Sequence, residues 1–158
     1  MPNQYQKHLL IIANIPSENT RLMRDSVLEG AASAETDHLS VIALSPLSAS
    51  PSDVKNADGI ILGTTENFGY MSGALKDFFD RVYYPCLNYT EGMPYAIYIR
   101  AGQDGTGTRR AIESITSGLH WKSVTTPLIC SGNWEKKFLS QCYNIGKLMA
   151  VGIDASIF

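Results

Sequence analysis

Short apolar runs alternate along this chain with longer segments whose apolar residues recur at helical spacing. Residues 8–14 read His-Leu-Leu-Ile-Ile-Ala-Asn, a run that is apolar on both faces, as a central strand of a parallel sheet is. Strands that alternate with helices in this way predict βαβ units and a parallel sheet. The expected strands are residues 8–14, 38–44, 59–63, 95–101 and 124–130.

The clearest helical segment follows the third expected strand, and Ser72 is placed to cap its first turn. Its apolar residues stand at positions i, i+3, i+4 and i+7 and are Leu75, Phe78, Phe79 and Val82. Further helical segments are expected from about Asn19, as a short turn at 53–56, around 111–119 and after Asn133. Each expected strand is therefore followed by a helical segment.

Five strands joined by helices can wind in only a few ways, because crossovers between parallel strands are right-handed. The leading arrangement is an α/β three-layer sandwich whose five-stranded parallel sheet has the order 2-1-3-4-5. No linker interrupts the pattern, so residues 1–158 are expected to form a single domain. The ligand crevice of such a fold lies at the carboxyl ends of strands 1 and 3, where the winding direction reverses.

Composition excludes several classes of function. A net charge of −2 with scattered basic residues offers no positive stripe for nucleic acid. The longest apolar run, residues 9–13, is too short to span a bilayer, so no membrane segment is expected. Three cysteines without a CxxC pair, together with the lack of a signal peptide, predict a cytoplasmic protein with free thiols. The three histidines stand far apart, so no metal site is expected.

The loop after the first strand, residues 15–21, runs directly into a helix. A helix start offers unpaired backbone N–H groups and the positive end of the helix dipole, which together favour a phosphate group. Ser17, Asn19 and Thr20 add short hydrogen-bonding side chains at that point. The same residue types are ordinary helix caps, so this loop by itself leaves both interpretations open.

Two more loops are expected at the same crevice. In residues 63–73, Phe68 or Tyr70 offers an apolar face for a flat ring, and Gly69 allows the backbone to approach the ring edge. Packing of these aromatics onto the end of the sheet is the alternative. Residues 101–110 are rich in glycine, but their G-x-x-G-x-G spacing differs from the dinucleotide fingerprint G-x-G-x-x-G.

A longer motif brings these loops together. Residues 63–81 read GTTENFGYMSGALKDFFDR and closely resemble the segment GTPxxFGxMSGxLKxFLDR of flavodoxin-like NAD(P)H-dependent FMN reductases and multimeric flavodoxin-type quinone reductases. Residues 17–21, SENTR, are similar to the SGNTR phosphate loop of that family, and residues 56–62 are similar to its third strand. With the matching order of strands and helices, the resemblance covers nearly the whole chain and implies a flavodoxin-like fold.

The resemblance implies an FMN cofactor whose flavin accepts hydride from NAD(P)H and passes electrons to a quinone, a free flavin or a protein partner. No side chain is expected to act as a general acid. The implied phosphate contacts are Ser17, Asn19 and Thr20. The implied isoalloxazine and ribityl contacts are Thr64, Thr65, Glu66, Asn67, Phe68 and Gly69, with Gly102, Gln103, Asp104 and Gly105 closing over the ring.

Three positions depart from the family pattern and keep alternatives open. Ile15 replaces a hydroxyl residue, Glu18 replaces a glycine beside the expected phosphate, and Thr65 replaces a proline. These changes predict weaker FMN binding, and they are the basis for a second interpretation, a flavodoxin-like binding protein that has lost tight FMN binding. A third interpretation is a non-catalytic electron carrier, although a net charge of −2 is mild for the acidic docking surface of such carriers.

An aromatic cluster at residues 83–89, Tyr-Tyr-Pro-Cys-Leu-Asn-Tyr, is expected as a loop after the clearest helix. Exposed aromatic clusters are typical of protein interfaces. The cluster therefore suggests a homodimer or homotetramer, with a loop folded back over the sheet edge as the alternative.

Overall fold

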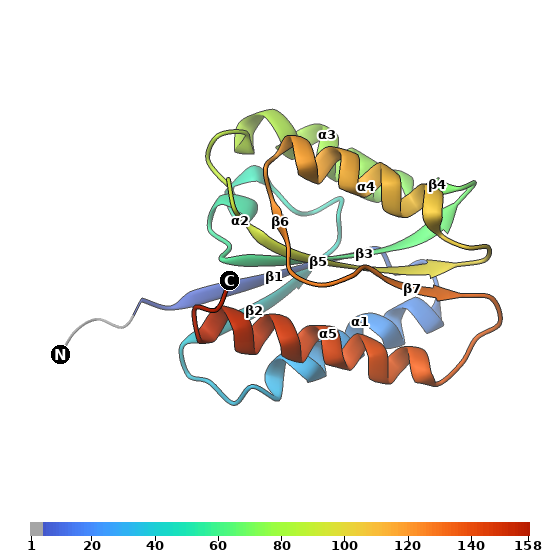
Figure 1. Ribbon diagram of the computed structural model, residues 1–158, viewed down its shortest axis with the longest axis horizontal. Helices are drawn as coiled ribbons and strands as arrows, with labels where there is room; N and C mark the ends of the chain where they lie inside the picture. Colours follow the sequence, from blue (N-terminus) through green and yellow to red (C-terminus); the bar gives the residue numbers. More distant parts are fainter. Residues whose placement is uncertain (1–4) are drawn as a thin grey trace.

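The computed structural model describes residues 5–158 and shows a parallel sheet between two layers of helices (Figure 1). The central strands pair in the order β2-β1-β3-β5, and the outer edge beside β5 is shared by the short strands β6 and β7. This order is equivalent to 2-1-3-4-5, so the predicted topology is confirmed. The strands of the parallel sheet are β1 (Lys7–Ala13), β2 (Leu39–Leu44), β3 (Gly59–Asn67), β5 (Pro94–Ala101), β6 (Lys122–Ser123) and β7 (Leu128–Ser131).

The central strands β1, β3 and β5 are largely buried on both faces, and successive side chains point to opposite helical layers. In β1, Leu9 and Ile11 belong to the core beneath α1 and α5, whereas Leu10 and Ile12 belong to the core beneath α2, α3 and α4. The two layers lie on opposite sides of the sheet (Figure 1). The helices are α1 (Glu18–Ala32), α2 (Pro51–Lys55), α3 (Gly73–Cys86), α4 (Thr106–Gly118) and α5 (Lys137–Asp154).

Two expected strands differ from the structure. The third, expected at 59–63, continues through Asn67 and folds back as a hairpin with β4 (Tyr70–Met71), because the dipeptide at 68–69 adopts a tight reversing turn. Of the last, expected at 124–130, only residues 128–130 form a strand, as part of β7, while β6 lies just before the expected range. Pro127 lies between β6 and β7 and has no N–H to donate to a ladder.

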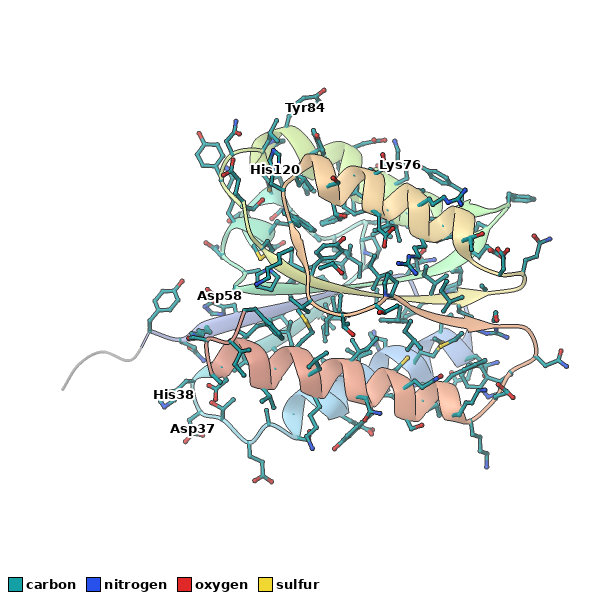
Figure 2. All side chains as sticks on the ribbon, viewed as in Figure 1. Asp37, His38, Asp58, Lys76, Tyr84 and His120 are labelled. Carbon is teal, nitrogen blue, oxygen red and sulfur yellow. The ribbon has the colours of Figure 1, made fainter. Side chains whose placement is uncertain are left out.

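The aromatic cluster at 83–89 was expected as a loop, but α3 continues through Pro85 to Cys86. Tyr83 is partly buried against the core, which explains why the helix extends this far. Tyr84 is 79% exposed and points outward from α3 (Figure 2), and Tyr89 is also exposed. The homodimer or homotetramer that these aromatics suggested stays a prediction.

The carboxyl ends of the strands lie together at the right of Figure 1. The β3–β4 hairpin, the start of α1 and the turns after β5 and β7 all gather at this edge. His38 and Asp58 lie at the opposite end of the sheet (Figure 2). The fold therefore places the three loops singled out in the sequence on one edge.

Candidate functional site

The first turn of α1 is closed by two side chains that cap each other. The Ser17 hydroxyl accepts a hydrogen bond from the Thr20 amide at 3.3 Å, and the Thr20 hydroxyl accepts one from the Ser17 amide at 3.0 Å. Thr20 is buried, whereas Ser17 is exposed and Asn19 half-buried. By helix geometry, the amides of Glu18 and Asn19 have no carbonyl acceptor in the preceding turn. These amides and the helix dipole give the start of α1 the character of an anion site.

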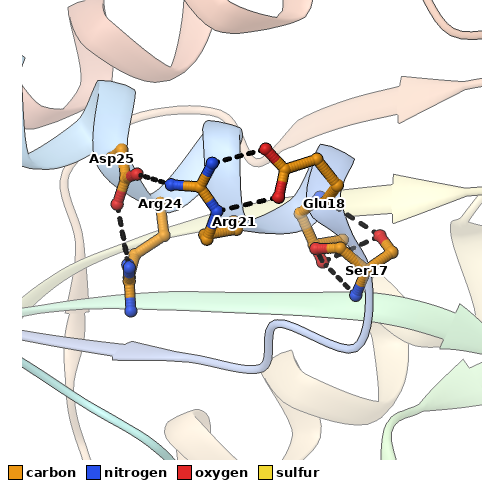
Figure 3. Close-up of polar contacts among 6 residues, drawn as sticks. Ser17, Glu18, Arg21, Arg24 and Asp25 are labelled. Atoms are coloured by element: carbon orange, nitrogen blue, oxygen red, sulfur yellow. Dashed lines mark hydrogen bonds and ion pairs between the residues drawn. The ribbon is translucent and has the colours of Figure 1, made fainter.

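The Glu18 side chain runs along the helix to Arg21 (Figure 3). The Arg21 Nε donates to Glu18 Oε2 at 2.9 Å, and its Nη1 donates to Asp25 Oδ2 at 2.7 Å. The hydrogen bond from Arg21 holds the pKa of the Glu18 carboxyl below its usual value. The negative charge that departs from the family pattern is thus paired with a guanidinium on the same helix.

The β3–β4 hairpin turns at Phe68 and Gly69, both of which have positive φ (53° and 73°). Two successive residues of positive φ form the type I′ turn that matches the twist of a hairpin. A bulky aromatic seldom adopts this conformation. The Phe68 side chain is fully exposed at the tip, so it does not pack onto the sheet end as the alternative interpretation expected.

Inside the hairpin, Thr64 and Thr65 are held by local hydrogen bonds. The buried Thr64 hydroxyl donates to the Thr65 carbonyl at 3.0 Å and accepts from the Ser72 amide at 3.1 Å. The Thr65 hydroxyl donates to Asn67 Oδ1 at 2.8 Å. Ser72 accepts from the Leu75 amide at 3.2 Å, which confirms its expected role as the cap of α3. Thr64 therefore connects the base of the hairpin to the start of α3.

The third loop is attached to the hairpin through Glu66. The Glu66 carboxylate accepts hydrogen bonds from the amides of Gln103 (2.8 Å) and Gly105 (2.7 Å). Asp104 accepts instead from the amide and the hydroxyl of Thr106, and these bonds lower the pKa of its carboxyl. Glu66 thus joins the second and third predicted loops. The first loop is linked to the base of the hairpin by the Asn14 amide, which donates to the Gly63 carbonyl at 3.0 Å.

Arg100 is a residue of this edge that the sequence interpretation missed. Its Nη1 donates to the carbonyls of Ala101 and Cys130, each at 2.9 Å, and its Nη2 donates to the Gly132 carbonyl at 2.7 Å. The guanidinium also lies 5.3 Å from the centre of the Phe138 ring. An arginine at the end of an otherwise apolar strand was the available signal. It places a fixed positive charge at the carboxyl end of β5, against the turn that follows β7.

The surface is hollowed at the opposite edge of the sheet. One hollow of about 270 Å³ is lined by residues that include His8, Asp53 and Asn56, and one of about 160 Å³ by residues that include Lys7 and Asp58. In open α/β sheets, ligands bind outside the carboxyl ends of the strands, at the switch point. We therefore place the candidate site at the carboxyl edge, where the three loops meet.

Neither a metal centre nor a membrane-spanning helix is found among residues 5–158. No group of three or more His, Cys, Asp or Glu side chains in this range is arranged to hold a metal ion. Over the same range, no helix combines the length and the apolar character needed to cross a bilayer.

The chain as a whole is similar in sequence or in structure to several known proteins. A flavodoxin of Aquifex aeolicus (strain VF5) is 31% identical over 111 residues, which are 70% of this chain and 59% of that protein. The chain thus spans about three fifths of the length of this relative. Among solved structures, a flavodoxin from the domain Archaea matches with a TM-score of 0.79 at 18% identity, covering 93% of this chain and 99% of that one. A WrbA-like flavodoxin protein from Agrobacterium tumefaciens matches with a TM-score of 0.72 at 15% identity, covering 95% and 98%.

These structural matches confirm the flavodoxin-like fold that the sequence resemblance implied. The family profile of the NADPH-dependent FMN reductases matches residues 45–135, more than half of the chain. That range contains the β3–β4 hairpin, the loop at 102–105 and the strands and helices between them. The chain belongs to the NADPH-dependent FMN reductase family.

Proposed function

We propose that this protein binds FMN at the carboxyl edge of its sheet. The phosphate lies on the first turn of α1, near the free amides of Glu18 and Asn19, and the flavin ring lies against the β3–β4 hairpin. The observation that carries the proposal is Phe68, a fully exposed aromatic held at φ 53° on the tip of that hairpin. Strained backbone held in place by the surrounding structure clusters at ligand-binding sites, and an exposed aromatic in this conformation has no packing role to explain it.

The residues of the edge suit the parts of FMN. The amides at the start of α1 attract a dianionic phosphate, and Arg21 offsets the Glu18 charge beside them, while the Phe68 ring offers a flat apolar surface for stacking. Gly69, Thr65 and Asn67 present backbone and short polar groups next to that surface. The exposed Ile15 contributes an apolar side chain at the rim of the first loop.

We further propose that the bound flavin accepts hydride from NAD(P)H and delivers electrons to a quinone, a free flavin or a protein partner. Membership of the NADPH-dependent FMN reductase family supports this reaction class. When bound, the flavin supplies the redox chemistry, and the chain's own groups bind, orient and shield it. The similarity to a flavodoxin supports a second candidate, an electron carrier that exchanges electrons with redox proteins without oxidising NAD(P)H.

The binding proposal is tested by titrating the purified protein with FMN and following flavin absorbance and fluorescence. Phe68→Asn removes the ring but keeps the turn, because Asn-Gly is a favoured type I′ dipeptide. We expect it to weaken FMN binding roughly tenfold, since stacking and burial of the ring are both lost. Tyr89→Asn removes an exposed aromatic that lies beyond α3, outside the proposed site, and serves as the matched control.

The FMN-loaded protein is then mixed with NADPH and a quinone. Steady NADPH oxidation supports the reductase, whereas tight FMN binding without NADPH oxidation supports the electron carrier. Failure of the unaltered protein to bind FMN at millimolar concentration would overturn both candidates and leave the interpretation in which tight FMN binding has been lost.

A further inference from the structure

The Glu66 side chain joins two loops that are far apart in the sequence. One carboxylate oxygen accepts from the Gln103 amide at 2.8 Å and the other from the Gly105 amide at 2.7 Å. Hydrogen bonds from neutral donors to a carboxylate are shorter and stronger than those between neutral groups. Both carboxylate oxygens are therefore engaged by backbone donors of the loop at 102–105.

Gly105 packs near Ile129, but the loop has few other hydrogen bonds that hold its shape. Gly105 is the N-cap of α4 with φ 70°, and no side chain caps the helix there. Asp104 bonds only to Thr106, two residues away, so its contacts do not tie the loop to the sheet. A short segment that contains two glycines has a large entropy to lose on ordering, and the bonds from Glu66 oppose that loss.

The hairpin also contacts the first turn of α4. The Thr108 hydroxyl donates to the Tyr70 carbonyl at 3.0 Å. A Cβ at Gly107 would lie 2.2 Å from the Gly69 carbonyl oxygen, so the two backbones touch at a position that only glycine permits. These contacts fix the helix against the hairpin, and Glu66 extends the same attachment to the loop that precedes the helix.

We propose that Glu66 is a positioning residue that locks the loop at 102–105 onto the β3–β4 hairpin, so that both walls of the flavin site are formed before the ligand arrives. The inference rests on the proposed FMN function and assigns Glu66 a role different from the direct flavin contact that the sequence resemblance implied. A preformed site binds its ligand more tightly, because the loop is already ordered and loses little conformational entropy on binding.

Substitutions at Glu66 separate its two hydrogen bonds. In Glu66→Gln, the amide oxygen still accepts from one backbone N–H, but the NH₂ group faces the other donor and loses that bond. Glu66→Ala loses both bonds. Glu113→Gln on α4 is the matched control, because it also removes one exposed carboxylate. Glu113 pairs with Arg109 at a distance of 3.0 Å and does not contact the loop at 102–105.

The first measurement is amide hydrogen exchange on the protein without FMN. We expect the Gln103 and Gly105 amides to exchange at least tenfold faster in Glu66→Ala than in the unaltered protein, with Glu66→Gln between them. The Ile112 amide inside α4 and all amides of Glu113→Gln should keep their rates. Equal exchange rates of the Gln103 and Gly105 amides in the unaltered protein and all three variants would contradict the proposal that Glu66 holds the loop.

The second measurement is FMN affinity, with the visible circular dichroism of bound flavin at saturation as a reporter of its surroundings. We expect Glu66→Ala to weaken FMN at least tenfold and to change the dichroism, whereas Glu113→Gln leaves both unaltered. Faster exchange without any change in affinity or dichroism would contradict the positioning role. If the unaltered protein binds no FMN, the proposed function fails, and the exchange rates alone still decide whether Glu66 holds the loop.

Discussion

Arg21 lies between two carboxylates, Glu18 and Asp25, on the exposed side of α1. The sequence placed the Glu18 charge beside an expected phosphate, where it would repel a dianion. The structure pairs that charge with Arg21, and Arg24 pairs with Asp25, which leaves a cluster of no net charge on the first turns of the helix. Arg21, rather than Glu18 alone, therefore sets the electrostatic cost of binding an anion there.

This arrangement predicts opposite outcomes for two substitutions. Glu18→Gln should change FMN affinity only slightly, because Arg21 already compensates the carboxylate. Arg21→Gln uncovers Glu18 and should weaken FMN roughly tenfold at low salt, since that charge then repels the phosphate, whereas Asp25 stays paired with Arg24. Calorimetric titration measures both affinities. At 0.5 M salt the loss of FMN affinity in Arg21→Gln should become smaller, because exposed charges are screened. A loss of affinity that does not change with salt would contradict an electrostatic origin.

At the scale of elements, α1 and α5 pack against each other unusually closely. A Cβ at Gly30 would lie 1.9 Å from the Tyr143 carbonyl oxygen, and a Cβ at Gly146 would lie 2.0 Å from the Val27 carbonyl oxygen. The absence of side chains at these positions lets the two helices cover one face of the sheet together. This layer supports the start of α1 and hence the proposed phosphate site.

Gly146→Ala should therefore destabilise the fold by about 1–3 kcal/mol, because the methyl group meets backbone atoms that cannot move aside without separating the helices. Urea unfolding followed by far-ultraviolet circular dichroism measures this free energy. Gly73→Ala is the matched control, since a Cβ there meets nothing within 4 Å. An unchanged unfolding midpoint for Gly146→Ala would show that the helices can separate at no cost.

At the scale of the whole molecule, the two cores on opposite faces of the sheet each contain cysteine. Cys86 lies in the core beneath α2, α3 and α4, and Cys130 and Cys142 lie in the core beneath α1 and α5. All three are free and fully buried, and burial raises the pKa of the Cys86 thiol. A buried thiol that ionises reluctantly reacts slowly, because the thiolate is the nucleophile.

Because all three cysteine side chains are buried, their reaction with a thiol reagent should report on opening of the molecule. In the native state, reaction with a disulfide reagent such as dithionitrobenzoate should be at least about a hundredfold slower than in denaturant, because native cores open only rarely. Absorbance of the released thiolate measures both rates, and full reaction in denaturant gives the count of thiols. Rapid reaction of one thiol under native conditions would reveal local opening of one core.

The sequence by itself determined the alternation of strands and helices, the sheet order, the Ser72 cap and the loops at the carboxyl edge. Each of these follows from local periodicity or from the handedness of crossovers, and the resemblance of residues 63–81 identified the family. The tertiary structure alone decided that Glu66 reaches a loop 37 residues away, that Arg100 binds three carbonyls, and that Phe68 stands exposed at a hairpin tip. Such contacts depend on which backbone groups the packed layers bring within hydrogen-bonding reach, and no local pattern encodes that distance.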